Sequence, residues 1–192
     1  MQIERTALPG VLLLTPRRHG DARGYFAETW SARAFAGAGI DLAFVQDNHS
    51  VSAAAGTLRG LHFQRPPRAQ DKLVRCGRGA LLDVAVDARA GSPSYGAWIA
   101  EELSEENGRQ LLVPKGFLHG FVTLRPDTEI VYKCSDFYAP EADGAVRWDD
   151  PGIGVGWGVT EPVISARDAA APLLSEIDPP FAYEGPLPWE AA

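Results

Sequence analysis

Frequent glycine and proline limit what this chain can fold into. The 192 residues include 20 Gly and 15 Pro, spread along the whole length. Few stretches can therefore support a long helix, whereas short strands joined by turns tolerate such interruption. The length suits a single core. We expect residues 1–192 to form one domain, with an extended N-terminal segment and a proline-rich C-terminal tail.

The middle of the chain has the pattern of short strands. Residues 72–76 and 80–87 are rich in aliphatic side chains and are joined by Gly77-Arg78-Gly79, which is typical of a strand, a turn and a second strand. Further strands are expected at residues 96–103, 110–113, 120–124 and 129–135. Strands that recur about every ten residues predict an all-β antiparallel sandwich or barrel. Two short helices are expected at residues 31–37 and 165–170, each preceded or begun by a capping serine.

Charge and apolar patterning exclude several classes of function. The chain has 18 Lys and Arg against 25 Asp and Glu, a net charge of −7, so we expect no nucleic-acid partner. A local cationic pocket for a small phosphate ligand remains possible. No apolar run approaches the roughly 18 residues of a membrane span, and Met1–Arg5 does not begin a signal peptide. Cys76 and Cys134 have no metal-type spacing, which predicts free thiols and a cytoplasmic location.

One segment concentrates polar side chains that could carry chemistry. If residues 59–64 form a regular strand, Arg59, Leu61 and Phe63 share one face, and Gly60, His62 and Gln64 share the other. A histidine beside a glutamine could line a barrel interior, or it could be a structural histidine satisfied within the fold.

Three other aromatic side chains leave similar alternatives open. His119 lies in a glycine-flanked segment that indicates close backbone approach, or simply a turn. Tyr132 and Tyr138 share a strand face if the strand continues that far, and otherwise they are core aromatics.

Metal and nucleotide-cofactor signatures are absent from the sequence. Glutamine, not a second histidine, stands two residues after His62, and the chain has only four histidines. The sequence contains no GxGxxG, GxxxxGK[ST] or GxSxG segment. We therefore expect neither a metal nor a cofactor.

Several motifs together resemble the dTDP-4-dehydrorhamnose 3,5-epimerase family. They lie in the family's order over roughly residues 5 to 175. The most specific are Arg59-Gly60-Leu61-His62-Phe63-Gln64, Lys72-Leu73-Val74, Gly116-Phe117-Leu118-His119-Gly120-Phe121 and Tyr132-Lys133-Cys134, supported by Asp21-Ala22-Arg23-Gly24-Tyr25-Phe26-Ala27-Glu28, Gln46-Asp47-Asn48, Asp83 to Arg89, Gly91-Ser92-Pro93, Trp148 to Pro151 and Ser165-Ala166-Arg167-Asp168. The resemblance implies a jelly-roll, cupin-like antiparallel barrel that acts without a metal. It also implies a homodimer in which the N-terminal segment contributes to the partner's site.

The same resemblance implies a substrate and the roles of individual residues. The substrate is a dTDP-4-keto-6-deoxy sugar, inverted at C3 and C5 through an enolate. His62 matches the catalytic base, Asp168 its paired carboxylate, Lys72 the group that stabilises the enolate oxygen, and Tyr132 the acid on the far face, with Tyr138 as the alternative acid. Arg23 and Arg59 match residues that bind the diphosphate, with help from His119. Phe26 and Glu28 match residues that contact the ligand across the dimer, and Gln46 and Asn48 match residues that contact the nucleotide or sugar. Further ligand contacts are matched by Tyr138, Asp143 and Arg167.

Three departures from the family pattern bear on specificity. Gly158 follows Trp157 where Pro is common, Leu118 stands where Ala is usual, and Lys115 stands where Glu is frequent. We expect Leu118, beside His119, to reshape the pocket. Two alternatives therefore stay open: an epimerase acting at C3 or C5 alone in a secondary-metabolite pathway, and a non-catalytic nucleotide-sugar-binding cupin. The joint presence of His62, Asp168, Lys72 and Tyr132 argues against the second.

Overall fold

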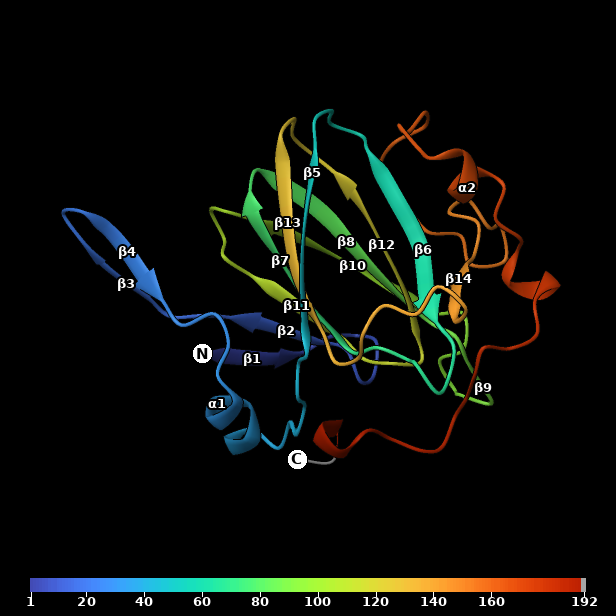
Figure 1. Cartoon of the computed structure of the whole chain (residues 1–192), viewed down its shortest axis with the longest axis horizontal. Helices are drawn as coiled ribbons and strands as arrows, with labels where there is room; N and C mark the ends of the chain where they lie inside the picture. The colour runs from blue at the N-terminus through green and yellow to red at the C-terminus, as the bar shows by residue number, and fades with distance from the viewer. Residues whose placement is uncertain (191–192) are drawn as a thin grey trace.

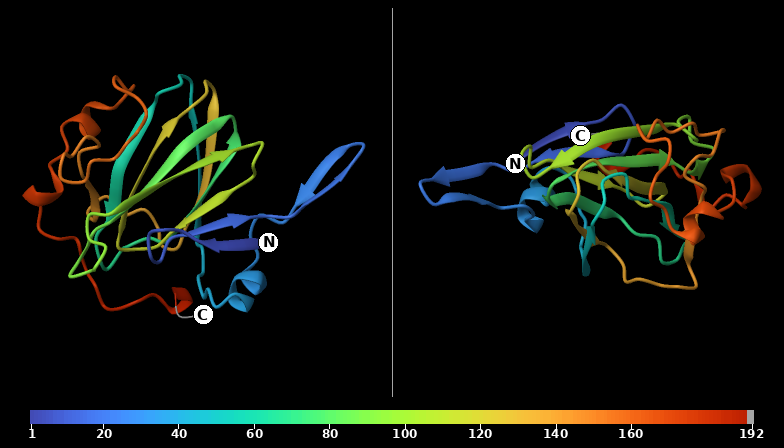
Figure 2. Two further views of the ribbon diagram at one scale, coloured as in Figure 1. Left: turned by 180° about the vertical axis from the view of Figure 1, so that it is seen from behind. Right: turned by 90° about the horizontal axis from the view of Figure 1, so that it is seen from above.

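The computed structural model describes residues 1–190, which form mainly two antiparallel sheets facing each other (Figures 1 and 2). The strands are β1 Gln2–Arg5, β2 Leu12–Thr15, β3 Arg18–Asp21, β4 Gly24–Ala27, β5 Gln46–Ser52, β6 Leu58–Gln64, β7 Lys72–Arg78, β8 Ala80–Asp87, β9 Arg89–Ala90, β10 Trp98–Ser104, β11 Gln110–Val113, β12 Phe117–Thr123, β13 Thr128–Cys134, β14 Asp143–Ala145 and β15 Phe181–Ala182. The helices are α1 Ala32–Gly37 and α2 Ala166–Ala169, with 3-10 turns at η1 Leu174–Glu176 and η2 Pro188–Glu190.

The strand order is that of a jelly-roll. One sheet has the order β1-β2-β11-β7-β13-β5 and the other β10-β8-β12-β6-β14. From β5 to β8 and again from β10 to β14, the chain passes from one sheet to the other at almost every step, so neighbours in a sheet are distant in sequence. This confirms the predicted all-β, cupin-like barrel.

Every strand expected in the middle of the chain is present, within a few residues of its predicted ends. Strands β7, β8, β10, β11, β12 and β13 correspond to the six predicted ranges. Both helices are present as well. Ser165 Oγ accepts the Asp168 amide at 3.1 Å and caps α2, whereas the Ser31 side chain makes no capping bond to α1.

The barrel interior changes from apolar to polar along its strands. On β13, Ile130 lies in the inter-sheet core, whereas Tyr132 and Cys134, farther along the same face, line a cavity. On β7, Val74 belongs to that core and Lys72 to the cavity. Period-two alternation keeps each set on one face. The polar end of the barrel is therefore where ligand chemistry can take place.

A bulge between β6 and β12 overturns the predicted alternation around His62. His119 is opposite His62 and Phe121 is opposite Arg59, so two residues of β6 face one residue of β12. Residues opposite each other project to the same side of a sheet. Arg59 therefore shares the face of His62, and its predicted placement with Leu61 and Phe63 was wrong.

Two glycines make this bulge possible. Gly60 has φ +126°, and a Cβ added there would lie 2.6 Å from Gly120 Cα and 2.9 Å from the His119 carbonyl oxygen. A Cβ on Gly120 would lie 2.9 Å from the Arg59 carbonyl oxygen. The two strands therefore approach each other backbone to backbone, as the glycines around His119 indicated.

Contacts with the rest of the fold hold the C-terminal tail. Strand β15 pairs in parallel with β9, and η2 buries Trp189, whose indole Nε1 donates to the Gly10 carbonyl at 2.9 Å. An aromatic side chain therefore anchors the tail near the N-terminal strands. No helix within residues 1–190 is long and apolar enough to cross a membrane.

A glycine-to-alanine pair tests the close approach. Gly24 has φ +127° but no atom within 4 Å of an added Cβ, so it matches Gly60 in backbone conformation only. We expect Gly24→Ala to cost about 1–3 kcal/mol of unfolding free energy through backbone strain. Gly60→Ala should lose a further ~1–3 kcal/mol through overpacking, as measured by urea unfolding. Equal losses in the two variants would contradict the steric explanation.

Candidate active site

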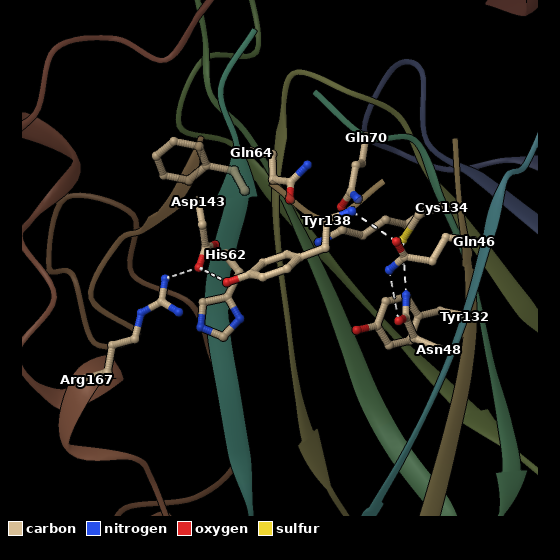
Figure 3. Close-up of a pocket in the computed structure, with 12 residues that line it drawn as sticks. Gln46, Asn48, His62, Gln64, Gln70, Tyr132, Cys134, Tyr138, Asp143 and Arg167 are labelled. Atoms are coloured by element: carbon tan, nitrogen blue, oxygen red, sulfur yellow. Dashed lines mark hydrogen bonds and ion pairs between the residues drawn. The ribbon is translucent and has the colours of Figure 1, made fainter. Parts of the chain in front are cut away.

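The polar end of the barrel contains a cavity of about 440 Å³ (Figure 3). Its walls come from both sheets, from helix α2 and from the segment that follows β13. The lining residues are Gln46, Asn48, His62, Phe63, Gln64, Gln70, Lys72, Tyr132, Cys134, Tyr138, Asp143 and Arg167. Eight of the residues predicted from the sequence are among them: His62, Lys72, Tyr132, Gln46, Asn48, Tyr138, Asp143 and Arg167.

One wall of the cavity contains His62, which is paired with a carboxylate behind it. His62 Nε2 lies 2.7 Å from Asp168 Oδ1, and the Gly60 amide donates to Asp168 Oδ2 at 3.3 Å. The Asp168 side chain is only 5% exposed. Burial alone would raise the pKa of Asp168, but the hydrogen bond and charge of His62 and the Gly60 amide together bring it below its ordinary value. The ionised carboxylate can therefore orient the imidazole and stabilise its protonated form.

Lys72 and Tyr132 line the cavity from the opposite sheet. Burial lowers the pKa of Lys72, partly offset by the charges of Cys134, Asp83 and Asp143. Burial also raises the pKa of Tyr132, so its phenol keeps its proton at neutral pH. One wall thus offers a base, and the other an acidic ammonium and a phenolic proton donor.

Polar contacts fix the side chains at the cavity mouth. Arg167 Nη2 pairs with Asp143 Oδ2 at 2.7 Å, and the Tyr138 hydroxyl donates to the same carboxylate oxygen at 3.3 Å. On the other side, Gln46 Nε2 donates to Asn48 Oδ1 at 3.0 Å. In Figure 3 the Tyr138 ring lies between these two groups.

Some predicted binding residues lie outside this cavity. His119 is buried, with Nε2 2.7 Å from Asp83 Oδ1, and is not among the lining residues. Arg59 is exposed on the same strand face as His62, and its charge acts to lower the pKa of Tyr132, which places it nearby.

Arg23, Phe26 and Glu28 lie on or next to the β3–β4 hairpin, which projects away from the barrel (Figure 1). The Arg23 side chain is 89% exposed and pairs with Asp21. Within one chain, this hairpin does not reach the cavity.

Four lining residues were not among the predicted site residues. The sequence pattern indicated Gln64, because it follows His62 by two positions on one strand face, and it indicated Cys134, which follows Tyr132 in the same way. No sequence pattern indicated Phe63 or Gln70. Gln70 lies between β6 and β7, where no periodicity indicates a direction.

The expected effect of Leu118 on the pocket was wrong. Leu118 is fully buried and belongs to the apolar cluster that contains Trp157, on the side of β12 opposite to His119. Gly158 follows Trp157 in a loop, with φ +73° and open space around it. Neither residue lines the cavity. In the described part of the chain, residues 1–190, no group of three or more His, Cys, Asp or Glu is arranged to hold a metal ion.

Comparisons with family models and with known proteins agree on one family. The family model described as dTDP-4-dehydrorhamnose 3,5-epimerase matches residues 5–176. The enzyme of that name from Sinorhizobium fredii is 51% identical over 184 residues, covering 95% of this chain and 94% of that protein.

Two solved structures bear on the ligand and on the number of centres. The 3,5-epimerase from Legionella pneumophila, in complex with dTDP-4-keto-L-rhamnose, has a TM-score of 0.92 at 41% identity, over 96% of this chain and 99% of that one. A 3'-monoepimerase from Streptomyces bikiniensis, in complex with dTDP-quinovose, has a TM-score of 0.84 at 36% identity, over 90% and 87%.

The lowered pKa of Asp168 predicts how stability depends on acid. A carboxylate whose pKa lies below its ordinary value of 3.8 in the folded state stabilises the fold above that value, and this contribution is lost as the pH falls through the folded pKa. We expect Asp168→Asn to reduce the loss of unfolding free energy between pH 5 and 3, measured by urea unfolding. Asp41→Asn, at an exposed position, is the control. Identical pH profiles for wild type and Asp168→Asn would contradict the assignment.

Proposed function

The chain belongs to the dTDP-4-dehydrorhamnose 3,5-epimerase family, and we propose that it inverts C3 and C5 of dTDP-4-keto-6-deoxy-D-glucose in rhamnose-type biosynthesis. One observation carries the assignment of roles. His62, which is paired with Asp168, and the phenol of Tyr132 line one cavity from facing sheets. Inversion of a carbon requires removal of a proton on one face and delivery on the other, so two facing walls suit it.

Proton removal begins at the wall formed by β6. The hydrogens on C3 and C5 are acidic because both carbons adjoin the C4 ketone. His62 takes the proton, the C–H electron pair forms a carbon–carbon double bond to C4, and the carbonyl pair moves onto the oxygen. Asp168 stabilises the resulting imidazolium. Lys72 donates to the enolate oxygen, and its lowered pKa makes it a stronger donor there.

Proton delivery completes the inversion from the opposite wall. Tyr132 protonates the carbanionic carbon on the face away from His62. Its pKa is raised by burial, which keeps the proton available for transfer. After His62 has released its proton to solvent and Tyr132 has taken one up from solvent, repetition of these steps at the second carbon gives the 3,5-inverted ketosugar.

The diphosphate binds to arginines, because a guanidinium fork matches phosphate oxygens. Arg59 lies on the His62 face of β6 near Tyr132, and no ion pair within residues 1–190 involves it. Arg23 supplies the second guanidinium from another subunit.

The enzyme is a homodimer in this proposal. The β3–β4 hairpin extends from the barrel (Figure 2). Tyr25 and Phe26 on it are 60% and 72% exposed. Large aromatic side chains on a projecting hairpin suggest burial against another molecule. In the dimer the hairpin brings Arg23, Phe26 and Glu28 to the partner's cavity. This accounts for their distance from the cavity of their own chain.

Neither a metal nor a cofactor is needed for these steps, because Lys72 supplies the positive charge at the enolate oxygen. We also propose a cytoplasmic location. Cys76 and Cys134 are buried free thiols, which fits a reducing compartment.

Deuterium incorporation tests the roles of the two walls. Wild type dialysed against EDTA should incorporate deuterium at C3 and C5 of dTDP-4-keto-6-deoxy-D-glucose in D₂O, as read by NMR. We expect His62→Ala to abolish exchange at both carbons. Tyr132→Phe, which keeps the ring volume, should retain exchange, especially at C3, while C5 inversion falls roughly 10²–10⁴-fold.

Three outcomes would change the assignment. Deuterium exchange catalysed by the His62→Ala variant would show that His62 is not the base. Loss of wild-type activity after EDTA, restored by one divalent ion, would make the enzyme metal-dependent. Wild-type inversion at C3 alone would assign the chain to the single-centre class, to which the Streptomyces bikiniensis monoepimerase belongs.

A subunit-mixing experiment tests the shared site. Arg23→Ala and His62→Ala homodimers should each be nearly inactive at low substrate concentration. Co-refolding equal amounts should restore about a quarter of wild-type activity, because half the dimers are mixed and each has one complete site. A mixture no more active than its components would show that the hairpin serves its own subunit or has no role.

A further inference from the structure

Three glutamine side chains below the cavity mouth bind one short backbone segment, residues 136–139. Gln64, only 5% exposed, accepts the Ala139 amide through Oε1 at 2.9 Å. Its Nε2 donates to the carbonyls of Phe137 at 3.2 Å and Arg68 at 2.7 Å. The Gln64 amide therefore joins the segment after β13 to the segment after β6.

The other two glutamines bind neighbouring peptide groups of the same segment. Gln46 Oε1 accepts the Tyr138 amide at 2.9 Å, and Gln70 Nε2 donates to the Asp136 carbonyl at 2.8 Å. Each of the four residues from Asp136 to Ala139 thus has a backbone group bound to a glutamine. We call Gln46, Gln64 and Gln70 the glutamine clamp.

The clamped segment has no regular structure of its own, yet it positions Tyr138. The backbone amide of Tyr138 is bound by Gln46 and its hydroxyl by Asp143, so the residue is held at both ends. Its side chain is largely exposed and lines the cavity, and the ring lies between the Asp143–Arg167 pair and Gln46 (Figure 3). A flat aromatic ring fixed at this position offers a surface to a planar ligand group such as a nucleotide base.

The hydrogen-bond inventory of Gln64 identifies it as a positioning residue. A glutamine amide has two N–H donors, and both of those of Gln64 are used by protein carbonyls. Gln64 lines the cavity but has no donor left for a ligand. Its Oε1 already accepts the Ala139 amide, so we assign its contribution to binding to the segment that it holds.

We propose that the glutamine clamp fixes Tyr138 at the mouth before ligand arrives, and that Gln64 thereby sets affinity for the nucleotide part of the substrate. The inference rests on the proposed function for its choice of dTDP as ligand. Preorganisation lowers the entropic cost of binding, so releasing the segment weakens binding without removing a direct contact. The clamp acts on the mouth, whereas proton transfer takes place between His62 and Tyr132.

A double-mutant cycle with dTDP tests this coupling. By calorimetry, Gln64→Met should weaken dTDP binding roughly tenfold, the effect of losing about 1.4 kcal/mol. Tyr138→Ala should weaken it at least as much. Because Gln64 acts through Tyr138, Gln64→Met in the Tyr138→Ala background should cost less than about a twofold further loss. Independent, multiplicative losses would overturn the proposal.

Kinetics and milder variants complete the test. In the deuterium-exchange assay, the effect of Gln64→Met should lie mainly in KM; a fall in kcat with unchanged KM would contradict the proposal. If Gln64→Met does not fold, as judged by circular dichroism, Gln70→Met removes one bond of the clamp and should produce a smaller loss of the same kind. Wild type that fails to bind dTDP would refute the proposed function. Wild-type binding that Gln64→Met and Gln70→Met leave unchanged would refute only the clamp.

Discussion

The backbone contact between Gly60 and Gly120 is the constraint on which the site depends. Since neither residue has a Cβ, β6 and β12 can approach closely enough for two residues of β6 to face one of β12. The resulting bulge brings Arg59 to the face of His62 and aims the Gly60 amide at Asp168. The proposed anion-binding residue and the orientation of the proposed base therefore follow from one local distortion of the sheet.

The second physical requirement is a polar cavity inside a small barrel. Burying Lys72 and Tyr132 disfavours their charged forms, and this is what shifts their pKa values in opposite directions. The apolar half of the interior, which includes Val74, Leu111 and Ile130, compensates by packing the same two sheets together. Strands β7 and β13 thus stabilise the fold at one end and present functional groups at the other.

The sequence predicts a strand well where its inward side chains are apolar and its pairing with the next strand is regular. Strands β7, β8 and β13 were predictable because most of their inward side chains are apolar and because Gly, Pro or Asp stands at their ends. Strand β5 was not, since it directs Gln46 and Asn48 toward a polar cavity while Val51 faces outward, which reverses the usual pattern. The face of Arg59 was mispredicted because alternation does not reveal a bulge. Most of the cavity residues were found through motifs, but Gln70 was not, because its place depends on tertiary contacts alone.

The contact between Trp189 and Gly10 bears on how the chain is made in the cell. These residues are 179 positions apart, and Trp189 belongs to the same apolar cluster as Leu12, Leu14 and Phe35 near the N-terminus. During synthesis, the N-terminal part of this cluster leaves the ribosome long before the tryptophan that covers it. The nascent protein thus carries an uncovered apolar surface until Trp189 has emerged, which is a form prone to aggregation. The arrival of Trp189, rather than the pairing of the central strands, closes this part of the core.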